Sequence, residues 1–403
     1  MGKRPTLSQL DRLRAEVEQA EPAFLHDLEK LVSIDCGSYS KAGVDEVADW
    51  MAARLAVLGA SIERHGHDTL GDTVVATFQG RRAGPTVLMI GHMDTVFDEG
   101  TASERPYAVR DGRAVGPGVG DMKAGLLGGL YALSALRGLG ALGDEGESWL
   151  PLGKVVFVVN PDEEIGSPSS TPIIKQLARD ADVSLVLEGA RANGDIVSAR
   201  KGMMHFDVTI TGRAAHAGVE PEKGRSATLE AAYKTLALHG LNGRWDGVSV
   251  NVGSIHGGSR PNIVADEAVI TIDMRARDLA TQQAARAAIE QVIETSTVAD
   301  VTSAVEITAH HRPMEKHEAS ARLIETAVAV AADLGFELAD TATGGGSDAN
   351  TTSGLGIPTL DGLGPIAGGA HTPDDYIELA SVVPRITLLA GLLLAIGQGR
   401  ASS

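Results

Sequence analysis

The sequence predicts an α/β protein: a split domain with a largely parallel central sheet flanked by helices, plus an inserted α+β domain. Three observations support this fold class. Short continuous apolar runs alternate with helical stretches in the first half of the chain. Later runs instead alternate apolar and polar residues. Finally, 403 residues with 43% hydrophobic content exceed one ordinary domain, so we expect two.

Helices are predicted first from apolar residues that recur at helical spacing. This pattern covers residues 7–32 and 44–58, and helical stretches follow at 125–136 and 171–181. The longest apolar segment, 386–396, is shorter than the roughly 20 residues that a membrane span requires. We therefore expect it to form a buried C-terminal helix.

Buried strands are predicted from short apolar runs that end at turn residues. Such runs occupy 73–78, 86–90, 155–159 and 184–187. Because both faces of a parallel sheet are covered by helices, its strands are apolar throughout rather than alternating. These runs therefore form the expected central sheet.

The inserted domain is predicted from strands with one wet face, at 205–211 and 268–273. Helices are expected at 225–239 and 279–296, which gives a strand-helix-strand-strand-helix-strand order. We expect the first domain to comprise 1–201 and 312–403, and the inserted domain to comprise 202–311.

Composition excludes several classes of partner. The net charge is 35 − 53 = −18, which repels phosphate backbones and anionic lipid, so we expect neither a nucleic acid nor a membrane as partner. Cys36 is the only cysteine, so neither an internal disulfide nor a thiolate metal cluster is possible. Without an apolar leader pattern near the N-terminus, we expect a cytoplasmic protein.

Candidate chemistry gathers where the predicted strands end, the usual position of a site in an open α/β sheet. Taken singly, such residues have ordinary explanations: a satisfied core histidine or a helix cap. However, three consecutive carboxylates at 162–164 repel one another unless a cation is present. The donors, all oxygen or nitrogen, favour catalytic zinc, or cobalt or manganese. They are His92, Asp121, Glu163, Glu164, Glu188 and His371.

The number of donors suggests two metal ions. A single catalytic ion needs three protein ligands and water, whereas two ions need one shared carboxylate and two further ligands each, five residues in all. Five of the donors above meet that requirement. Glu163 is then left over, and at a turn it can lean over a metal-activated water as a general base.

Six ordered motifs resemble a known family. The chain is similar to the zinc-dependent exopeptidases and amidohydrolases that include glutamate carboxypeptidase, acetylornithine deacetylase, succinyl-diaminopimelate desuccinylase and aminoacylase. The resemblance covers nearly the whole chain and is closest to the glutamate carboxypeptidase branch. The motifs are Gly-His-Met-Asp-Thr-Val at 91–96, Gly-Pro-Gly-x-x-Asp at 116–121, Asp-Glu-Glu-x-Gly-Ser at 162–167, Gly-x-Ala-x-His-Ala-Gly at 212–218, Gly-Gly-Gly-Ser-Asp-Ala at 344–349, and His371.

The resemblance implies a role for each motif residue. Asp121 would bridge two zinc ions. His92 and Glu188 would hold one ion, and Glu164 and His371 the other, with Glu163 as the general base. Asp94 would accept the other ring N–H of His92 and so fix its tautomer.

For the inserted domain, the resemblance implies a homodimer in which His216 reaches the partner's site and stabilises the oxyanion. Asn262 and Arg275 match positions that hold the free carboxylate of the substrate, with backbone N–H groups around Gly345 as further donors. For Arg275, a surface ion pair is the alternative interpretation.

Two departures from the family pattern concern the bridging turn and the substrate. Met122 and Lys123 follow Asp121 where a second Asp or Asn is usual, and relatives have a cis peptide at this point. The recognition lysine expected after Glu188 is missing from 191–196. Arg191, Arg200 or Lys201 would replace it, or the side chain accepted is not glutamate. His310 and His311 are candidates for lining the pocket or for an exposed hinge.

We therefore expect a di-zinc hydrolase that cleaves an amide bond next to a free carboxylate. The substrate would be a small peptide-like molecule or an N-acyl amino acid. A related enzyme that acts on a non-peptide C–N bond is the alternative, because such motifs specify metal and water more tightly than substrate. A non-catalytic, metal-stabilised binding protein is the third.

Overall fold

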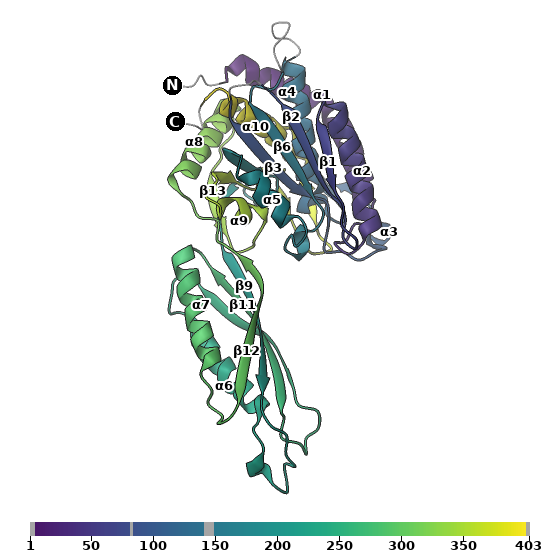
Figure 1. Ribbon diagram of the computed structural model, residues 1–403. Coiled ribbons are helices and arrows are strands. Elements are labelled where there is room, and N and C mark those ends of the chain that lie inside the picture. The colour runs from purple at the N-terminus through teal and green to yellow at the C-terminus, as the bar shows by residue number, and fades with distance from the viewer. Residues whose placement is uncertain (1–4, 81–83, 141–148, 400–403) are drawn as a thin grey trace. The chain divides into compact units, whose positions relative to one another are not determined.

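The computed structural model describes residues 5–80, 84–140 and 149–399, and within these ranges it divides into two compact units. Unit 1 contains the described residues up to 198, those from 316 to 342 and those from 347 onward; unit 2 contains 199–315 and 343–346. The predicted fold class is confirmed: unit 1 has a mostly parallel sheet flanked by helices, and unit 2 has an antiparallel sheet with two helices (Figure 1).

The main sheet of unit 1 has the strand order β1-β2-β6-β3-β7-β14. From β6 to β14 the neighbouring strands pair in parallel, whereas β2 pairs antiparallel with both β1 and β6. The strands β2, β3, β6 and β7 are the four predicted buried runs. Their bounds are β1 (Ser61–His65), β2 (Thr73–Gln79), β3 (Thr86–His92), β6 (Lys154–Asn160), β7 (Val183–Val186) and β14 (Thr359–Leu360).

Helices cover both faces of this sheet. One apolar core contains residues of α1, α2, α4, α8 and α10 with alternate residues of the strands, while α5 and α9 contact each other in front of the sheet in Figure 1. Every helix that periodicity predicts here is present. The bounds are α1 (Leu7–Val32), α2 (Lys41–Val57), α3 (Thr101–Glu104), α4 (Ala124–Gly140), α5 (Thr171–Ala178), α8 (Glu318–Asp333), α9 (Asp348–Ser353) and α10 (Val382–Gly397).

The predicted C-terminal helix is part of this core. Together with η4 (Leu379–Ser381), α10 forms a helical segment, Leu379–Gly397, whose length and mean hydropathy of 2.1 would allow it to cross a membrane. However, 78% of its most apolar window is buried against the rest of the structure. It is therefore the apolar core helix that the sequence predicts.

Smaller elements complete unit 1. A second sheet has the order β15-β16-β5-β4, and short turns precede α4 and follow β6. β8 and β13 form a two-stranded sheet, and the boundary between the units falls within both strands. The bounds are β4 (Ala108–Arg110), β5 (Arg113–Val115), β15 (Ala367–Gly368), β16 (Tyr376–Glu378), β8 (Ile196–Arg200), β13 (Asp340–Thr343), η1 (Val119–Lys123) and η2 (Glu163–Ile165).

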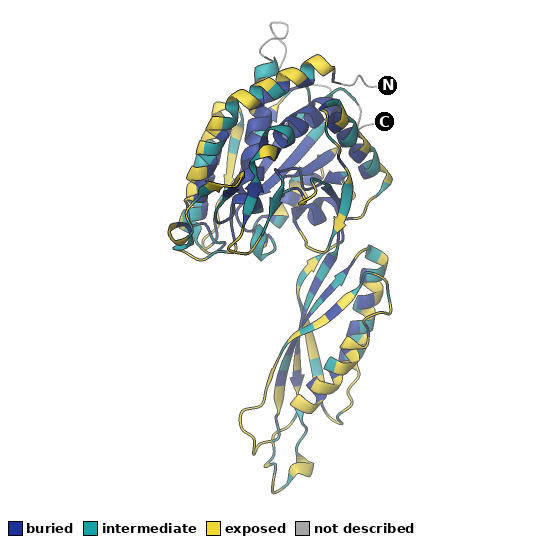
Figure 2. Ribbon diagram, turned by 180° about the vertical axis from the view of Figure 1, so that it is seen from behind, coloured by how far each residue is buried: buried dark blue, intermediate teal, exposed yellow. Residues whose placement is uncertain are grey.

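Unit 2 has the predicted strand-helix-strand-strand-helix-strand order. Its antiparallel sheet runs β10-β11-β9-β12, and buried positions alternate with more exposed ones along β9 and β11, as Figure 2 shows by colour. Side chains of Ser226 and Asp278 cap α6 and α7. The bounds are β9 (Gly202–Thr211), η3 (Pro221–Lys223), α6 (Ala227–His239), β10 (Ser249–Gly257), β11 (Glu267–Ala276), α7 (Leu279–Glu294) and β12 (Thr302–His311).

Residues of the central strands are buried in the core of unit 1. Phe157 in β6 is fully buried, so the Phe157→Ala substitution should lower the free energy of unfolding by about 3–5 kcal/mol. Urea denaturation followed by tryptophan fluorescence measures the change. Val57→Ala, at a position that is 75% exposed, is the control and should stay within about 0.5 kcal/mol of the parent. Equal effects of the two substitutions would contradict this packing.

Candidate metal centre

The site begins at the carboxyl ends of three neighbouring parallel strands. His92 is the last residue of β3 and is opposite Asn160, the last residue of β6. On the other side of β3, Ile90 pairs with Val186, the last residue of β7. Glu188 comes two residues after Val186, just as His92 comes two residues after Ile90, so the two residues are in register. This register brings His92 Nε2 to 3.6 Å from Glu188 Oε1.

Asp121 lies between two imidazoles. Its Oδ1 is 3.2 Å from Nε2 of His92, and its Oδ2 is 3.2 Å from Nε2 of His371. His371, which has φ of 61° and an exposed side chain, is also 3.0 Å from Oε2 of Glu164. The two oxygens of one carboxylate therefore face two separate histidines, each with a second carboxylate beside it.

The turn that carries Asp121 is held tightly in place. The peptide bond from Asp121 to Met122 is cis, although Met122 and Lys123 depart from the family pattern at this point. Lys123 is buried, and its Nζ donates to the carbonyls of Ile34 at 3.2 Å and Pro117 at 3.5 Å. A Cβ on Gly125 would lie 1.8 Å from the carbonyl oxygen of Leu187, so only glycine permits this approach of α4 to the chain beside Glu188.

Glu163 and Glu164 lie in η2, and the carboxylate of Asp94 fixes this turn. The backbone N–H of Glu163 donates to Asp94 Oδ1 at 3.1 Å, and that of Glu164 donates to Oδ2 at 3.2 Å. Ser38 Oγ also donates to Oδ2 at 2.7 Å. Asp94 therefore positions the two glutamates through their main chain.

The contact between Asp94 and His92 differs from the one that the family resemblance implies, in which Asp94 accepts the ring N–H of His92. Nδ1 of His92 is 3.0 Å from the backbone carbonyl oxygen of Asp94 and 3.4 Å from its carboxylate. The closer acceptor for the ring N–H is thus the main chain. The carboxylate is engaged mainly with the η2 turn and Ser38, contacts that no sequence motif indicates.

Burial and like charges shape the electrostatics of the cluster. Burial raises the pKa of Glu163 well above its ordinary value, and the charge of Glu188 adds to the rise while His92 opposes it. Burial opposes ionisation of Asp121, but hydrogen bonds from His371 and His92 lower its pKa. Hydrogen bonds to Asp121 and Glu164 raise the pKa of His371 to about 10. The cluster therefore favours positive charge at its centre.

These residues fit a divalent-metal site by the chemistry of their donors. Ligand atoms of His92, Asp121 and Glu164 lie within 4.8 Å of one another, as do those of His92, Glu163 and Glu188. The set offers imidazole nitrogens and carboxylate oxygens without sulfur, which suits zinc, cobalt or manganese with positions left for water and substrate. The second group shows that Glu163 is also close enough to serve as a ligand.

Sequence reasoning gave no role to a second layer of buried acids. Asp348, the first residue of α9, accepts from Ser167 Oγ at 2.6 Å and from the side chain of Asn160, and burial raises its pKa to about 6. Asp375 accepts from the backbone N–H of Gly120 at 3.1 Å, and burial raises its pKa to about 8. Asp348 lies within the 344–349 motif and Asp375 lies four residues after His371, but sequence spacing gave neither acid a partner.

The remaining candidates lie in unit 2. His216 and Asn262 are exposed on segments that pair with each other: the N–H of Ala217 donates to the carbonyl of Asn262 at 3.0 Å. Arg275 Nε donates to Asp273 at 2.9 Å, the ion pair that the sequence leaves as an alternative.

Arg200 is the buried member of the three residues offered in place of the missing lysine. Its guanidinium donates to the carbonyl oxygens of Gly345 at 3.1 Å and Gly346 at 3.3 Å. It therefore orders the glycine segment in which Gly345 lies.

Comparison with known proteins places these observations in a family. The model of peptidase family M20/M25/M40 matches residues 88–395. Carboxypeptidase G2 of Pseudomonas sp. (strain RS-16) is 29% identical over 94% of this chain and 91% of its own length. Acetylornithine deacetylase of Proteus mirabilis (strain HI4320) is 26% identical over 92% of this chain and 96% of its own length.

A solved structure shares the fold. Aminopeptidase PepT from Bacillus cereus ATCC 10987 matches with a TM-score of 0.75 and 23% identity, covering 93% of this chain and 98% of that one. The resemblance read from the six motifs is thus confirmed. The chain belongs to peptidase family M20/M25/M40 and is a metal-dependent hydrolase of the carboxypeptidase and deacetylase kind.

Proposed function

We propose that the protein is a two-metal hydrolase that cleaves an amide bond adjacent to a free carboxylate, as in a C-terminal glutamate-like residue or an N-acyl amino acid. The observation that carries the proposal is the position of Asp121, whose two oxygens each lie 3.2 Å from a different histidine. A carboxylate in that position suits a bridge between two ions. Zn²⁺ is the expected ion, with Co²⁺ and Mn²⁺ as alternatives.

In this proposal Asp121 would be shared by both ions. His92 and Glu188 would hold one ion and Glu164 and His371 the other, in keeping with the pairs at 3.6 Å and 3.0 Å. When bound, the ions would polarise the scissile carbonyl and lower the pKa of water. The protein supplies the geometry, because strand ends position His92 and Glu188 and the Asp94 contacts position Glu163 and Glu164.

Glu163 is the proposed general base. Its carboxylate takes a proton from the attacking water as the new C–O bond forms, and the resulting carboxyl group later delivers that proton to the amine nitrogen as the C–N bond breaks. Burial raises the pKa of Glu163, which suits a group that must hold a proton between the two steps. Five other residues suffice to hold two ions, so this glutamate is free for proton transfer.

Residues of unit 2 complete the proposed site. His216 would donate to the carbonyl oxygen as it becomes tetrahedral. Asn262, Arg275 and the N–H groups around Gly345 would bind the substrate's free carboxylate. The 215–217 and 262–264 segments pair with each other, which holds His216 and Asn262 side by side and supports a joint role for them.

Unit 2 is also the proposed dimerisation unit. Leu229, Tyr233 and Leu236 of α6 are 48%, 43% and 73% exposed and recur at helical spacing, which gives an apolar stripe suited to a second copy of the chain. β10 is an edge strand of the sheet beside it. We propose a cytoplasmic homodimer in which His216 acts on the partner's site.

The role of Asp121 is tested by metal binding. Adding Zn²⁺ should raise the melting temperature of the parent, since an ion that binds only the folded state stabilises it by about 2.7 kcal/mol at roughly 100 times Kd. Chelation should reverse the shift and abolish hydrolysis. Asp121→Asn should lose the shift, whereas Asp68→Asn, at an exposed position, should keep it. A full shift with Asp121→Asn would contradict the bridging role.

The role of Glu163 is tested by separating turnover from metal content. Glu163→Gln should lower kcat by about 10²–10⁴ because proton transfer is lost. Metal content, measured by mass spectrometry of the digested protein, should match the parent. Glu46→Gln, on the exposed side of α2, is the matched control. Loss of an ion from Glu163→Gln would instead identify Glu163 as a ligand, and full activity would exclude it as the base.

The role of His216 across subunits is tested by mixing two inactive variants. Glu163→Gln and His216→Ala homodimers each lack one group at every site. After subunit exchange, half of the dimers are mixed, and each contains one site with both groups if His216 acts on the partner. About a quarter of parental activity should then return, by the statistics of two-fold dimers. If exchange is complete and no activity returns, His216 does not act in trans.

A further inference from the structure

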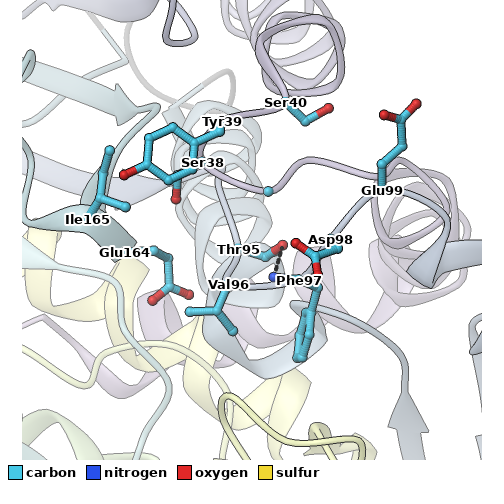
Figure 3. Close-up of a pocket in the computed structure, with 11 residues that line it drawn as sticks. Ser38, Tyr39, Ser40, Thr95, Val96, Phe97, Asp98, Glu99, Glu164 and Ile165 are labelled. Carbon is cyan, nitrogen blue, oxygen red and sulfur yellow. Dashed lines mark hydrogen bonds between the residues drawn. The ribbon is translucent and has the colours of Figure 1, made fainter. Parts of the chain in front are cut away.

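The glutamates of η2 and the glutamate that follows β7 are supported by different parts of unit 1. Asp94 holds the main chain of Glu163 and Glu164 and also accepts from Ser38. Figure 3 shows this side of the cluster, where Glu164 faces a pocket of about 450 Å³. Glu188 lies beyond the end of β7, where other contacts hold the main chain.

Within unit 1, the main chain around Glu188 runs beside segment 362–367. The N–H of Gly364 donates to the carbonyl oxygen of Glu188 at 2.8 Å. A Cβ on Gly364 would lie 2.9 Å from the carbonyl oxygen of Leu187 and 3.0 Å from that of Glu188. The two segments therefore touch at a point where a side chain has no room, so a shift of one displaces the other.

The residue after Glu188 is enclosed just as tightly. A Cβ on Gly189 would lie 2.6 Å from the Cβ of Ala367 and 3.1 Å from the carbonyl oxygen of Gly120. Gly120 directly precedes Asp121, the proposed bridging ligand. The main chain at Glu188 and Gly189 thus contacts both segment 362–367 and the turn that carries the shared carboxylate.

One buried side chain holds segment 362–367 in place. Arg385 lies in the first turn of α10 and is 3% exposed. Its Nε donates to the carbonyl oxygen of Gly364 at 3.0 Å, and its Nη2 donates to that of Gly362. Its Nη1 donates at 3.0 Å to the carbonyl oxygen of Gly194, in the next turn of the chain that carries the proposed ligand. Because a guanidinium is planar and rigid and has donors on three nitrogens, one side chain fixes all three carbonyls.

The surroundings of Arg385 are unfavourable for a charged side chain. Its hydrogen-bond partners within the described part of the chain are main-chain carbonyls rather than a carboxylate. Burial lowers its pKa to about 10, and the charge of Asp195 opposes that shift, so the side chain is still charged at neutral pH. Burial of such a cation costs free energy that an apolar residue of similar size would avoid. The three carbonyl contacts are what offset this cost.

We propose that Arg385 is a positioning residue for the metal site: by holding the glycine carbonyls, it sets the main chain of Glu188 so that the carboxylate lies beside His92. The inference rests on the proposed two-metal function, in which these two residues hold one ion. The second ion has another support, since Asp94 fixes Glu164 through its backbone N–H. Loss of Arg385 should therefore weaken one ion and spare the other.

The experiment measures the zinc affinity of Arg385→Met, which keeps the approximate length of the side chain and removes its donors. Zn²⁺ is titrated into the metal-free protein in competition with a chromophoric chelator, which gives one dissociation constant for each of two ions. The substitution should raise one constant by about 10–100-fold, the effect of losing a group that orients a metal ligand. The other constant should stay within about threefold of the parental value.

Double variants identify the ion that is affected. On a Glu188→Gln background, Arg385→Met should change zinc affinity no further, because both substitutions act on the same ligand. On a Glu164→Gln background, which removes a ligand of the other ion, Arg385→Met should keep its full 10–100-fold effect. The difference between the two backgrounds is a result that a general loss of stability does not produce.

Two further variants separate positioning from stability and from charge. Leu393→Ala truncates a buried side chain about two turns further along α10, so it should lower the melting temperature but leave both zinc constants within about threefold of the parent. Arg385→Lys keeps the charge but has a single nitrogen, which cannot reproduce the planar set of donors. It should still weaken the same ion by at least about threefold, and it provides the test if Arg385→Met does not fold.

The outcomes distinguish failure of this inference from failure of the proposed function. If the parent binds two zinc ions and the folded Arg385 variants bind both with parental affinity, or weaken both equally, Arg385 does not position Glu188 and the two-metal function stands. If the parent binds fewer than two zinc ions, the two-metal function is overturned, and the inference with it. Circular dichroism in the far ultraviolet establishes which variants are folded.

Discussion

The carboxylates of Asp121, Glu163, Glu164 and Glu188 gather around buried His92, and their mutual repulsion is the constraint on which the rest of unit 1 depends. Such crowding is tolerated only where the fold holds the groups rigidly and a cation can join them. Parallel strand register supplies the rigidity, because it sets His92, Glu163 and Glu188 at one edge of the sheet. Burial opposes the charged form of His92, but neighbouring carboxylates raise its pKa and that of His371, so both imidazoles favour the positively charged form.

Asp94 connects this cluster with its surroundings. Its two oxygens accept from the main chain of η2 and from Ser38, so one buried acid fixes both the catalytic turn and a wall of the neighbouring pocket. Arg385 has the corresponding place beyond β7, where its contacts hold segment 362–367 beside Glu188. In the proposed site the two ions thus depend on separate supports.

Much of this architecture is predictable from sequence, for identifiable reasons. Apolar runs mark β3, β6 and β7 because parallel strands are buried on both faces, and the donors His92, Glu163 and Glu188 stand at the ends of these strands or within three residues after them. Alternation in β9 and β11 likewise indicates a sheet with one wet face. Helix periodicity predicts α1, and a continuous apolar segment predicts α10, each to within a few residues of the observed bounds.

Other features depend on contacts between segments far apart in sequence, and no local pattern encodes them. The contacts of Ser38 with Asp94, of Asn160 with Asp348, and of Arg200 with the Gly345 carbonyl join residues 56, 188 and 145 positions apart. The closer approach of His92 to the Asp94 main chain than to its carboxylate is of the same kind. Such details follow from the packing of loops, which periodicity does not determine.

The most direct test of the central claim is anomalous X-ray diffraction at the zinc edge from crystals grown with Zn²⁺. The account predicts two anomalous peaks per chain on either side of the Asp121 carboxylate, one beside His92 and Glu188 and the other beside Glu164 and His371. A single peak held by His92, Glu163 and Glu188, or none near Asp121, would contradict it.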